Sequence, residues 1–416
     1  MSTDITKKQK FYTLFLLVLV FTSSHIDRNI IAILLQPIKE TFLVSDTQLG
    51  FLTGVTFALF YATLAMPMAM WADRHNRRNL IALSISLWSL MTAFCGLAFQ
   101  YWQLILFRIG VGVGEAGSNP PSHSIISDLY SPEERGTAMA IFATGVNIGV
   151  MMGFLIGGWV NEWLNWRWAF VIAGVPGVLI AFLVRFTMKE PQRGFSEGLT
   201  KESQAPSFTS VVRYMFKNII IRHFVIAHAL FALFGYSAIA WTPVYFQRIH
   251  LFSSGEVGTF LALSIGLGGG VGTFLGGFIA DKLAYRNEGW RAWIICFAVL
   301  IYIPTAILSF TALDSSSAMY WFLGPAILGS FHVGIIFAVL QSEAPVEMRS
   351  VVAAINLFVL NIIGMGLGPL MVGIVSDYME PSVGIDSLRY GLLITTILPI
   401  WGAFHMWRGG VLLSSK

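Results

Sequence analysis

Twelve apolar stretches, each long enough to cross a lipid bilayer as a helix, constrain this chain more than any other feature. A helix needs about 20 mostly apolar residues to span the hydrocarbon core. Of the 416 residues 56% are hydrophobic and 12% are charged, whereas soluble domains average about 25% charged. The sequence therefore predicts an all-α integral membrane protein with twelve transmembrane helices, near residues 11–36, 47–71, 79–99, 102–127, 137–160, 167–188, 220–246, 256–281, 290–312, 318–342, 350–377 and 386–407.

Basic side chains are concentrated on one side of this predicted topology. Lys7 and Lys8 precede the first stretch, Arg77 and Arg78 follow the second, and Lys282 follows the eighth. Because cytoplasmic loops carry an excess of Lys and Arg, we predict that both termini are cytoplasmic in a multi-pass protein of a bacterial inner membrane or a plasma membrane. This topology also explains the net charge of +4. Without a soluble basic domain, no nucleic-acid partner is expected.

The chain repeats itself with a period of about half its length. Asp73 follows the second stretch and Asp281 ends the eighth, while Pro132 and Pro345 precede the fifth and eleventh stretches at nearly the same separation along the chain. Repetition at this period indicates two pseudo-symmetric six-helix bundles. We expect them at 1–188 and 220–416, joined by a cytoplasmic linker at 189–219 with a short surface helix near 208–217.

Four charged side chains, Asp27, Arg28, Arg108 and Glu115, lie in the interior of predicted spans and away from their ends. Such a charge costs roughly 2.5–3.5 kcal/mol on insertion scales, so it usually faces a partner or a water-filled path. Arg108 and Glu115 are about two turns apart and share one side of their helix, whereas Asp27 and Arg28 point about 100° apart. We predict that Arg28 and Arg108 bind an anionic group and that Asp27 and Glu115 take part in proton coupling. A purely structural set of two ion pairs is the alternative.

The run Arg108-Ile-Gly-Val-Gly-Val-Gly-Glu115 is rich in glycine but does not predict nucleotide binding. A dinucleotide fingerprint needs a preceding strand, and none is expected here. Close helix packing explains the glycines, as it does the four-spaced ridge Gly145, Gly149, Gly153 and Gly157. Cys95 and Cys296, the two cysteines, each lie in mid-span. Neither a disulfide nor a metal site is expected, and no cofactor is predicted.

The connection between the second and third spans carries a recognisable motif. Ala69, Asp73, Arg74, Arg77 and Arg78 follow the pattern G-x-x-x-D-R-x-G-R-R, with Ala69 and Asn76 in place of glycines, and Gly277 and Asp281 echo it in the second half. The chain thereby resembles the major facilitator superfamily, which implies the major facilitator fold. An acid at a helix end and arginines beyond it can clasp neighbouring helix termini. We expect a gating role for Asp73, Arg74, Arg77, Arg78, Asp281, Arg135 and Arg349.

Within the first half the resemblance is narrower. Asp27-Arg28, the run from Arg108 to Glu115 and the segment Ile125-Ile-Ser-Asp128-Leu-Tyr are similar to the Spinster family, over about residues 20–150. That resemblance implies proton-linked transport of lysophospholipids or sphingosine-1-phosphate. It also implies that Asp27, Arg108 and Glu115 correspond to the charged residues of that family.

The second half lacks Asp, Glu, Lys and Arg in mid-span, so we expect it to form an apolar, aromatic wall. The predicted substrate contacts on this wall are Phe231, Phe234, Trp241 and Phe358. Taken together, these features predict a monomeric, proton-coupled secondary active transporter that works by alternating access. Its partners would be membrane lipids, protons and an amphipathic anionic or zwitterionic molecule such as a lysolipid. A symporter of small organic anions such as sugar acids, a multidrug/proton antiporter and a gradient-independent scramblase are the alternatives. An enzyme is not expected, since no catalytic set appears at helical spacing.

Overall fold

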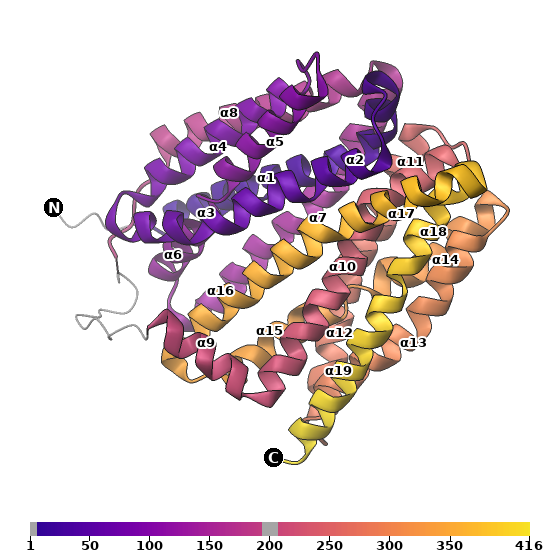
Figure 1. The fold of residues 1–416 in the computed structure, drawn as a ribbon. Coiled ribbons are helices and arrows are strands. Elements are labelled where there is room, and N and C mark those ends of the chain that lie inside the picture. Colours follow the sequence, from indigo (N-terminus) through magenta and orange to yellow (C-terminus); the bar gives the residue numbers. More distant parts are fainter. Residues whose placement is uncertain (1–5, 194–206) are drawn as a thin grey trace. The chain divides into compact units, whose positions relative to one another are not determined.

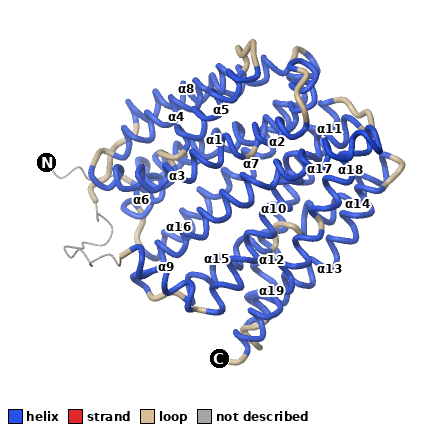
Figure 2. The backbone as a smooth tube through the Cα atoms, viewed as in Figure 1, coloured by secondary structure: helices blue, strands red, loops and turns tan. Residues whose placement is uncertain are grey.

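The computed structural model describes residues 6–193 and 207–416, which are helical and contain no β-strand (Figures 1 and 2). Ten helical segments in these ranges are long and apolar enough to cross a membrane. One of them, Val346–Ser414, has 69 residues and contains two passes, and residues 101–129 form one more as two shorter helices. The prediction of a twelve-helix membrane protein is confirmed. Part of the predicted linker, residues 194–206, lies outside the described residues, and a short helix forms at Phe208–Lys217 as expected.

The described helices fall into two compact units. Unit 1 contains α1 (Lys7–Phe42), α3 (Val55–Arg74), α4 (Arg77–Cys95), α5 (Tyr101–Glu115), α6 (Asn119–Leu129), α7 (Pro132–Trp163), α8 (Trp166–Thr187) and α11 (Ser254–Leu261). Unit 2 contains α2 (Asp46–Thr53), α9 (Phe208–Lys217), α10 (Ile219–Arg248), α12 (Gly268–Ala284), α13 (Trp290–Thr311), α14 (Ser315–Leu328), α15 (His332–Glu343), α16 (Arg349–Val359), α17 (Gly368–Val383), α18 (Ser387–Thr395) and α19 (Ile397–Ser414). Two π-helical segments, η1 (Ala262–Leu267) and η3 (Leu360–Leu367), precede α12 and α17.

Side-chain caps mark where several of these helices begin. Thr6 caps α1 through a reciprocal bond pair with Gln9, which satisfies two backbone N–H groups that the helix leaves unpaired. Asn76 caps α4 by accepting a hydrogen bond from the backbone N–H of Asn79 at 2.8 Å. Asn76 therefore serves as a helix cap at the motif position where glycine was expected.

Glycines bring α1 and α7 of unit 1 into close contact, as the four-spaced ridge predicts. A Cβ atom at Gly145 would lie 3.2 Å from the carbonyl oxygen of Val18, and one at Gly153 would lie 3.1 Å from that of Ile26. Without those carbon atoms the two backbones can approach each other closely between Gly145 and Gly157. The same unit packs α4 against both α5 and α8 (Figure 1).

In unit 2, α10 is the central helix and packs against α17, η3 and α19. Two of its buried aromatic side chains donate hydrogen bonds to carbonyl oxygens of neighbouring helices. The indole N–H of Trp241 donates to Pro369 at 2.8 Å, and the hydroxyl of Tyr245 donates to Ser309 at 2.7 Å. Gly368 meets α10 closely, since a Cβ atom there would lie 2.7 Å from the Leu233 oxygen.

Candidate functional site

An ion pair joins the first and fifth helices inside unit 1. The Nε atom of Arg28 on α1 lies 2.5 Å from Oε2 of Glu115 on α5. The Glu115 side chain is fully buried, and the Arg28 side chain is 17% exposed. Because both residues lie within membrane spans, each charge compensates the other where water cannot.

Asp27 and Arg108 complete a set of four charged residues, all within unit 1. Asp27 is fully buried, and Arg108 donates from Nη1 to the backbone oxygen of Asp27 at 3.1 Å. Among the described residues, neither carboxyl oxygen of Asp27 has a hydrogen-bond partner, and the same holds for Nε of Arg108. Two adjacent residues thus differ sharply, since Arg28 is paired and the Asp27 carboxyl is not.

Glycines in α5 allow this convergence. A Cβ atom at Gly112 would lie 2.8 Å from the backbone oxygen of Phe57 on α3, and one at Gly114 would lie 2.7 Å from the backbone nitrogen of Trp88 on α4. The glycine run between Arg108 and Glu115 therefore seats α5 tightly against α3 and α4. This contact supports the packing interpretation of the run.

Two aromatic rings of α3 lie beside the arginines, and sequence reasoning missed both. The Arg28 guanidinium carbon is 4.3 Å from the ring centre of Tyr61 and 5.1 Å from that of Phe57. The Phe57 ring centre also lies 5.3 Å from the Arg108 guanidinium carbon. A guanidinium over an aromatic face is attracted by the ring quadrupole. The four-residue spacing of Phe57 and Tyr61 is common in apolar helices, so the sequence held no distinguishing signal.

Trp88 and Thr92, also absent from the sequence prediction, flank the Asp27 carboxyl from α4. Both side chains lie near it. In the described part of the chain their donor atoms, the indole N–H and the hydroxyl, are buried without a hydrogen-bond partner. A carboxyl group with unused donors around it can change its protonation or its partner without first losing a hydrogen bond.

Unit 2 contains a buried polar cluster in addition to the aromatic residues predicted there. His228 of α10 is fully buried and lies 3.2 Å from Oδ1 of Asn356 on α16, measured from Nδ1. Its ring centre is 5.4 Å from that of His332 on α15. Polar groups are therefore present in the interior of both units.

The predicted aromatic contacts of unit 2 differ in exposure. Phe231 and Phe234 are buried, and Phe234 stacks on Tyr302 with ring centres 5.8 Å apart. Trp241 is fully buried and bonded to Pro369, while Phe358 is 45% exposed. Of the four, Phe358 is the side chain with surface available in this structure.

The predicted gating residues of unit 1 are a buried arginine and more exposed neighbours. Arg77 is 1% exposed and is bound by Asp128, by Ser124, by the Pro191 oxygen and by Oε1 of Glu190 at 2.8 Å. This network ties the start of α4 to α6 and to the segment after α8. Asp73 and Arg74 are exposed. The backbone N–H of Arg78 donates to Glu190, and Arg135 donates to the Ser127 oxygen.

The gating residues predicted in unit 2 are both exposed. Asp281 pairs with Arg291 at 3.0 Å, and Arg349 donates from Nε to the Ala344 oxygen at 3.3 Å. These contacts are local to the ends of α12 and α16.

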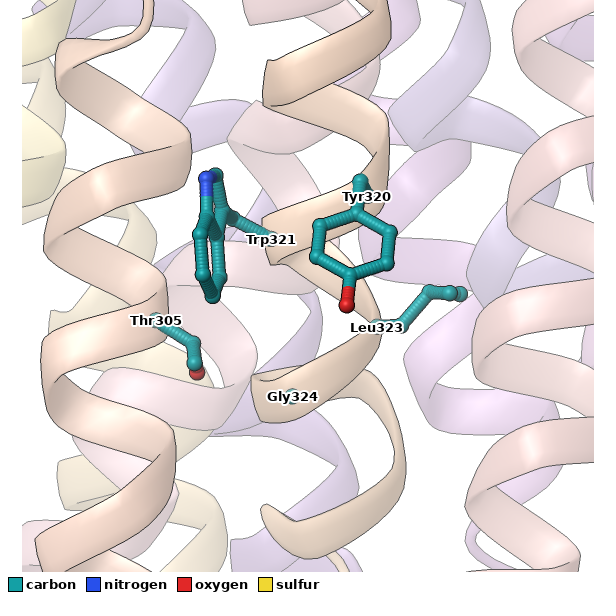
Figure 3. A pocket seen from close by; sticks show the side chains of 5 residues that line it. All are labelled: Thr305, Tyr320, Trp321, Leu323 and Gly324. Atoms are coloured by element: carbon teal, nitrogen blue, oxygen red, sulfur yellow. The ribbon is translucent and has the colours of Figure 1, made fainter.

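A surface hollow of about 230 Å³ belongs to unit 2 and includes no residue of the charged set (Figure 3). Thr305 of α13 faces Trp321 and Gly324 of α14 across it, and Tyr320 and Leu323 complete the lining. The lining is mostly apolar, and the Thr305 hydroxyl already donates within its own helix. The hollow therefore offers little for recognising a charged substrate.

Across residues 6–193 and 207–416, no group of three His, Cys, Asp or Glu side chains is placed to hold a metal ion.

Comparisons with known proteins agree with this architecture. Residues 17–369 match the sequence profile described as Major Facilitator Superfamily. The chain is 30% identical over 392 residues to an MFS-type efflux pump of Mycolicibacterium smegmatis. The aligned region covers 94% of this chain and 90% of the relative. It is 25% identical to protein spinster homolog 3 of Danio rerio, over 96% of this chain and 85% of the relative. A solved structure of a bacterial homologue of the human lysosomal transporter Spinster, inward-facing and unoccupied, superposes with a TM-score of 0.88 at 30% identity, covering 98% of each chain.

Proposed function

Because the chain belongs to the Major Facilitator Superfamily, we propose that it is a proton-coupled secondary active transporter that carries an amphipathic anionic or zwitterionic molecule by alternating access. The chain is a Spinster-like membrane transporter and not an enzyme. The observation that carries the finer proposal is the ion pair of Arg28 and Glu115 beside the Asp27 carboxyl, which has no hydrogen-bond partner among the described residues.

The proposed coupling follows from competition for one guanidinium. Arg28 is bound to Glu115 at 2.5 Å, so an anionic head group must displace that carboxylate to bind the same fork. A proton on Glu115 removes its charge and releases Arg28, while Asp27 supplies a second buried carboxyl for a proton. Substrate binding and proton binding are thereby linked through one pair of residues. Arg108 would add a second positive charge for the head group.

Lysophospholipid and sphingoid-phosphate molecules suit this arrangement. Their head groups carry phosphate, which a planar guanidinium binds in a bidentate manner. Their hydrocarbon chains need apolar surface, for which Phe358 is the exposed candidate in unit 2, whereas Phe231, Phe234 and Trp241 are buried. The resemblance of residues 20–150 to the Spinster family is the reason for proposing this substrate class.

A transporter of small organic anions is the second candidate. The polar cluster of His228, Asn356 and His332 favours it, because a hydrophilic anion needs hydrogen-bonding groups in both units. The chain is also 26% identical over 366 residues to a probable L-galactonate transporter of Escherichia coli, covering 82% of this chain and 80% of the relative.

The proposal includes a topology and a gate. Both termini would be cytoplasmic, with six-helix bundles at 1–188 and 220–416 in a monomer. The gating set would act at the cytoplasmic ends, where Arg77 is already bound within unit 1 and the exposed Asp73 and Arg74 remain for partners in another state.

Proteoliposomes with an imposed pH gradient test the function. Labelled lysophosphatidylcholine and a labelled sugar acid are the two probes, and proton movement is followed with a trapped pH dye. We expect gradient-dependent movement of the lipid probe that is lost in Arg108→Ala, Glu115→Gln and Asp27→Asn. Glu133→Gln, which neutralises an exposed carboxyl at the start of α7, is the matched control.

Three other outcomes of this experiment would each contradict the proposal. Coupled flux of the sugar acid alone would select the second candidate. Lipid movement that ignores both the pH gradient and Asp27→Asn would indicate a scramblase. Unchanged coupled flux in all three site variants would remove the proposed site.

A further inference from the structure

A pair of histidines joins the first and last long helices of unit 2, α10 and α19, which pack side by side (Figure 1). Nδ1 of His223 on α10 lies 2.8 Å from Nδ1 of His405 on α19, and the two ring centres are 5.0 Å apart. Gly409 permits this approach, because a Cβ atom there would lie 2.8 Å from the Phe224 ring and 3.8 Å from Cβ of His223. Both histidines are half-buried, so part of each ring remains accessible from outside the unit.

Unit 1 has a polar side-chain pair at the corresponding place, between the first and last spans of the first half. The hydroxyl of Tyr12 on α1 lies 2.6 Å from that of Thr187 on α8. Each of these two residues and of the two histidines lies within three residues of one end of its predicted span. Both pairs therefore belong to the boundary between the hydrocarbon and the head groups of the bilayer, where polar side chains meet phosphate.

Two arginines lie beside the histidine pair. Arg222 directly precedes His223, Arg408 follows His405 by three residues, and both arginines are exposed and lie near His223. Within the described ranges of the chain, no acidic side chain forms an ion pair with either guanidinium group. A surface that gathers charge of one sign without neutralisation attracts the opposite charge. We call these four side chains the basic cluster: Arg222, His223, His405 and Arg408.

The bond between the histidines leaves a donor for an anion. In a neutral pair, the ring that accepts the hydrogen bond at Nδ1 carries its own proton on Nε2. This Nε2–H group and the two guanidinium groups can donate to the oxygens of one phosphate, which guanidinium groups bind in a bidentate manner. The basic cluster therefore has the donors that a phosphate group needs.

Exposed aromatic side chains border the basic cluster on α19. Trp401 is 56% exposed and Phe404 is 57% exposed, and their ring centres lie 6.0 and 5.7 Å from that of His405. Both residues precede His405 in a membrane-spanning segment, whereas Arg408 follows it, so the aromatic rings lie deeper in the span than this arginine. The surface thus changes from cationic to apolar in the same order as a phospholipid changes from head group to acyl chain.

We propose that the basic cluster binds the head group of an anionic phospholipid of the surrounding bilayer, whose acyl chains lie along Trp401 and Phe404. Four basic side chains favour a head group with a net negative charge over a zwitterionic one, because the choline of the latter is repelled. The apolar border favours a lipid over a soluble anion. This lipid is a partner of the protein and not its transported substrate. The site lies in unit 2 and shares no residue with the charged set of unit 1, so it does not depend on the proposed function.

Native mass spectrometry of the full-length protein in detergent tests the site by counting bound lipids. The probes are phosphatidylglycerol and phosphatidylcholine with identical acyl chains. We expect phosphatidylglycerol to bind with roughly tenfold or higher affinity than phosphatidylcholine. The double variant Arg222→Gln with Arg408→Gln should lower the affinity for phosphatidylglycerol by roughly tenfold or more and leave that for phosphatidylcholine nearly unchanged. Both arginines are exposed, so we expect this variant to fold.

Three variants control for charge and for the histidine bond. Arg213→Gln with Arg286→Gln removes two other exposed arginines of unit 2 and should keep the preference for phosphatidylglycerol. His405→Phe keeps an aromatic ring without a donor and should weaken binding of this lipid, but less than the loss of both cluster arginines. Tyr12→Phe, which breaks the corresponding polar pair of unit 1, should leave its affinity unchanged.

Equal affinity for the two lipids, or equal losses in the two double arginine variants, would overturn the site. Unchanged binding in His405→Phe would overturn the assignment of the histidines. Thermal unfolding with added inorganic phosphate tells a soluble anion from a lipid, since stabilisation by phosphate equal to that by phosphatidylglycerol would overturn the lipid assignment. None of these measurements requires transport, so a failed lipid site can be told apart from a wrong substrate or from absent proton coupling.

Discussion

Arg28 and Glu115 form a 2.5 Å ion pair between α1 and α5, while Asp27, the neighbour of Arg28 in sequence, directs only its backbone oxygen to a charged partner, Arg108. The pair and the carboxyl lie in the interior of unit 1, within membrane spans. The energetic coupling of the pair, its aromatic surroundings and the packing that creates it can each be measured.

Neutralising one member of the pair should cost more than neutralising both. We expect Glu115→Gln to lower the free energy of unfolding by roughly 3 kcal/mol, because it leaves the Arg28 charge without its partner in a buried place. The double variant Arg28→Gln with Glu115→Gln should recover part of this loss. Thermal unfolding in detergent of the four proteins of this cycle measures the coupling, and strictly additive losses would show that the pair is not coupled.

Tyr61 should act through its ring. The ring centre lies 4.3 Å from the Arg28 guanidinium carbon, so Tyr61→Phe keeps the cation–π contact and Tyr61→Leu removes it. We expect Tyr61→Leu to lower the transport rate of the substrate by roughly twofold to fivefold, in line with about 0.5–1 kcal/mol for such a contact. Tyr61→Phe should stay near wild type. Equal losses in both variants would assign the role to the hydroxyl instead.

Helix α7 supplies a matched control for its glycine ridge, because Gly136 lies on the same helix outside the ridge. A Cβ atom at Gly149 would lie 2.6 Å from the Thr22 oxygen of α1, whereas one at Gly136 would meet nothing within 4 Å. We expect Gly149→Ala to lower the free energy of unfolding by roughly 1–3 kcal/mol through overpacking. Gly136→Ala should be neutral or slightly stabilising, since alanine favours the helix. Unfolding of both variants in detergent makes the comparison, and equal stability would contradict the close packing of α1 and α7.

Asp314 should stabilise α14 in a pH-dependent way. Its carboxylate caps the helix by accepting a hydrogen bond from the backbone N–H of Ser317 at 2.8 Å, and this bonding lowers the pKa of Asp314 below its usual value. A lowered carboxyl pKa stabilises the fold above the ordinary pKa, and the gain disappears as pH falls through the lowered value. We expect Asp314→Ala to lower the Tm near pH 7, with the difference shrinking below about pH 4.

Asp314→Asn is the control for that measurement. Asparagine also caps helices well but carries no charge. Its Tm difference from Asp314→Ala should therefore be independent of pH. A difference that followed pH in the same way as that of the wild type would rule out the carboxylate as its source.

The sequence was informative about the segments inside the membrane, because few backbone conformations are possible there. Backbone N–H and C=O groups in lipid must be satisfied within the segment, so a long apolar stretch can hardly be anything but a helix. The same restriction made Asp27, Arg28, Arg108 and Glu115 conspicuous, and they do gather in one unit. The repeat seen at Asp73 and Asp281 also holds in three dimensions, since Ser45 and Ser253 cap equivalent helices at the same spacing.

The sequence did not show which side chains contact one another. Helical periodicity showed that Asp27 and Arg28 point in different directions, but it did not show that Arg28 pairs with Glu115 or that Phe57 and Tyr61 lie beside the guanidinium groups. Nothing in the sequence relates His228 to Asn356, which lie 128 residues apart and meet only in the folded chain.

The apolar lengths and the repeat therefore determined by themselves that this chain forms twelve membrane helices in two related halves. The tertiary structure alone decided which charges meet, which rings border them, and that α2 and α11 each pack in the unit opposite to the helix that follows. The reason is physical: a helix's own sequence fixes the direction of each side chain around its axis, whereas its rotation and register against a neighbour depend on close packing of both surfaces at once.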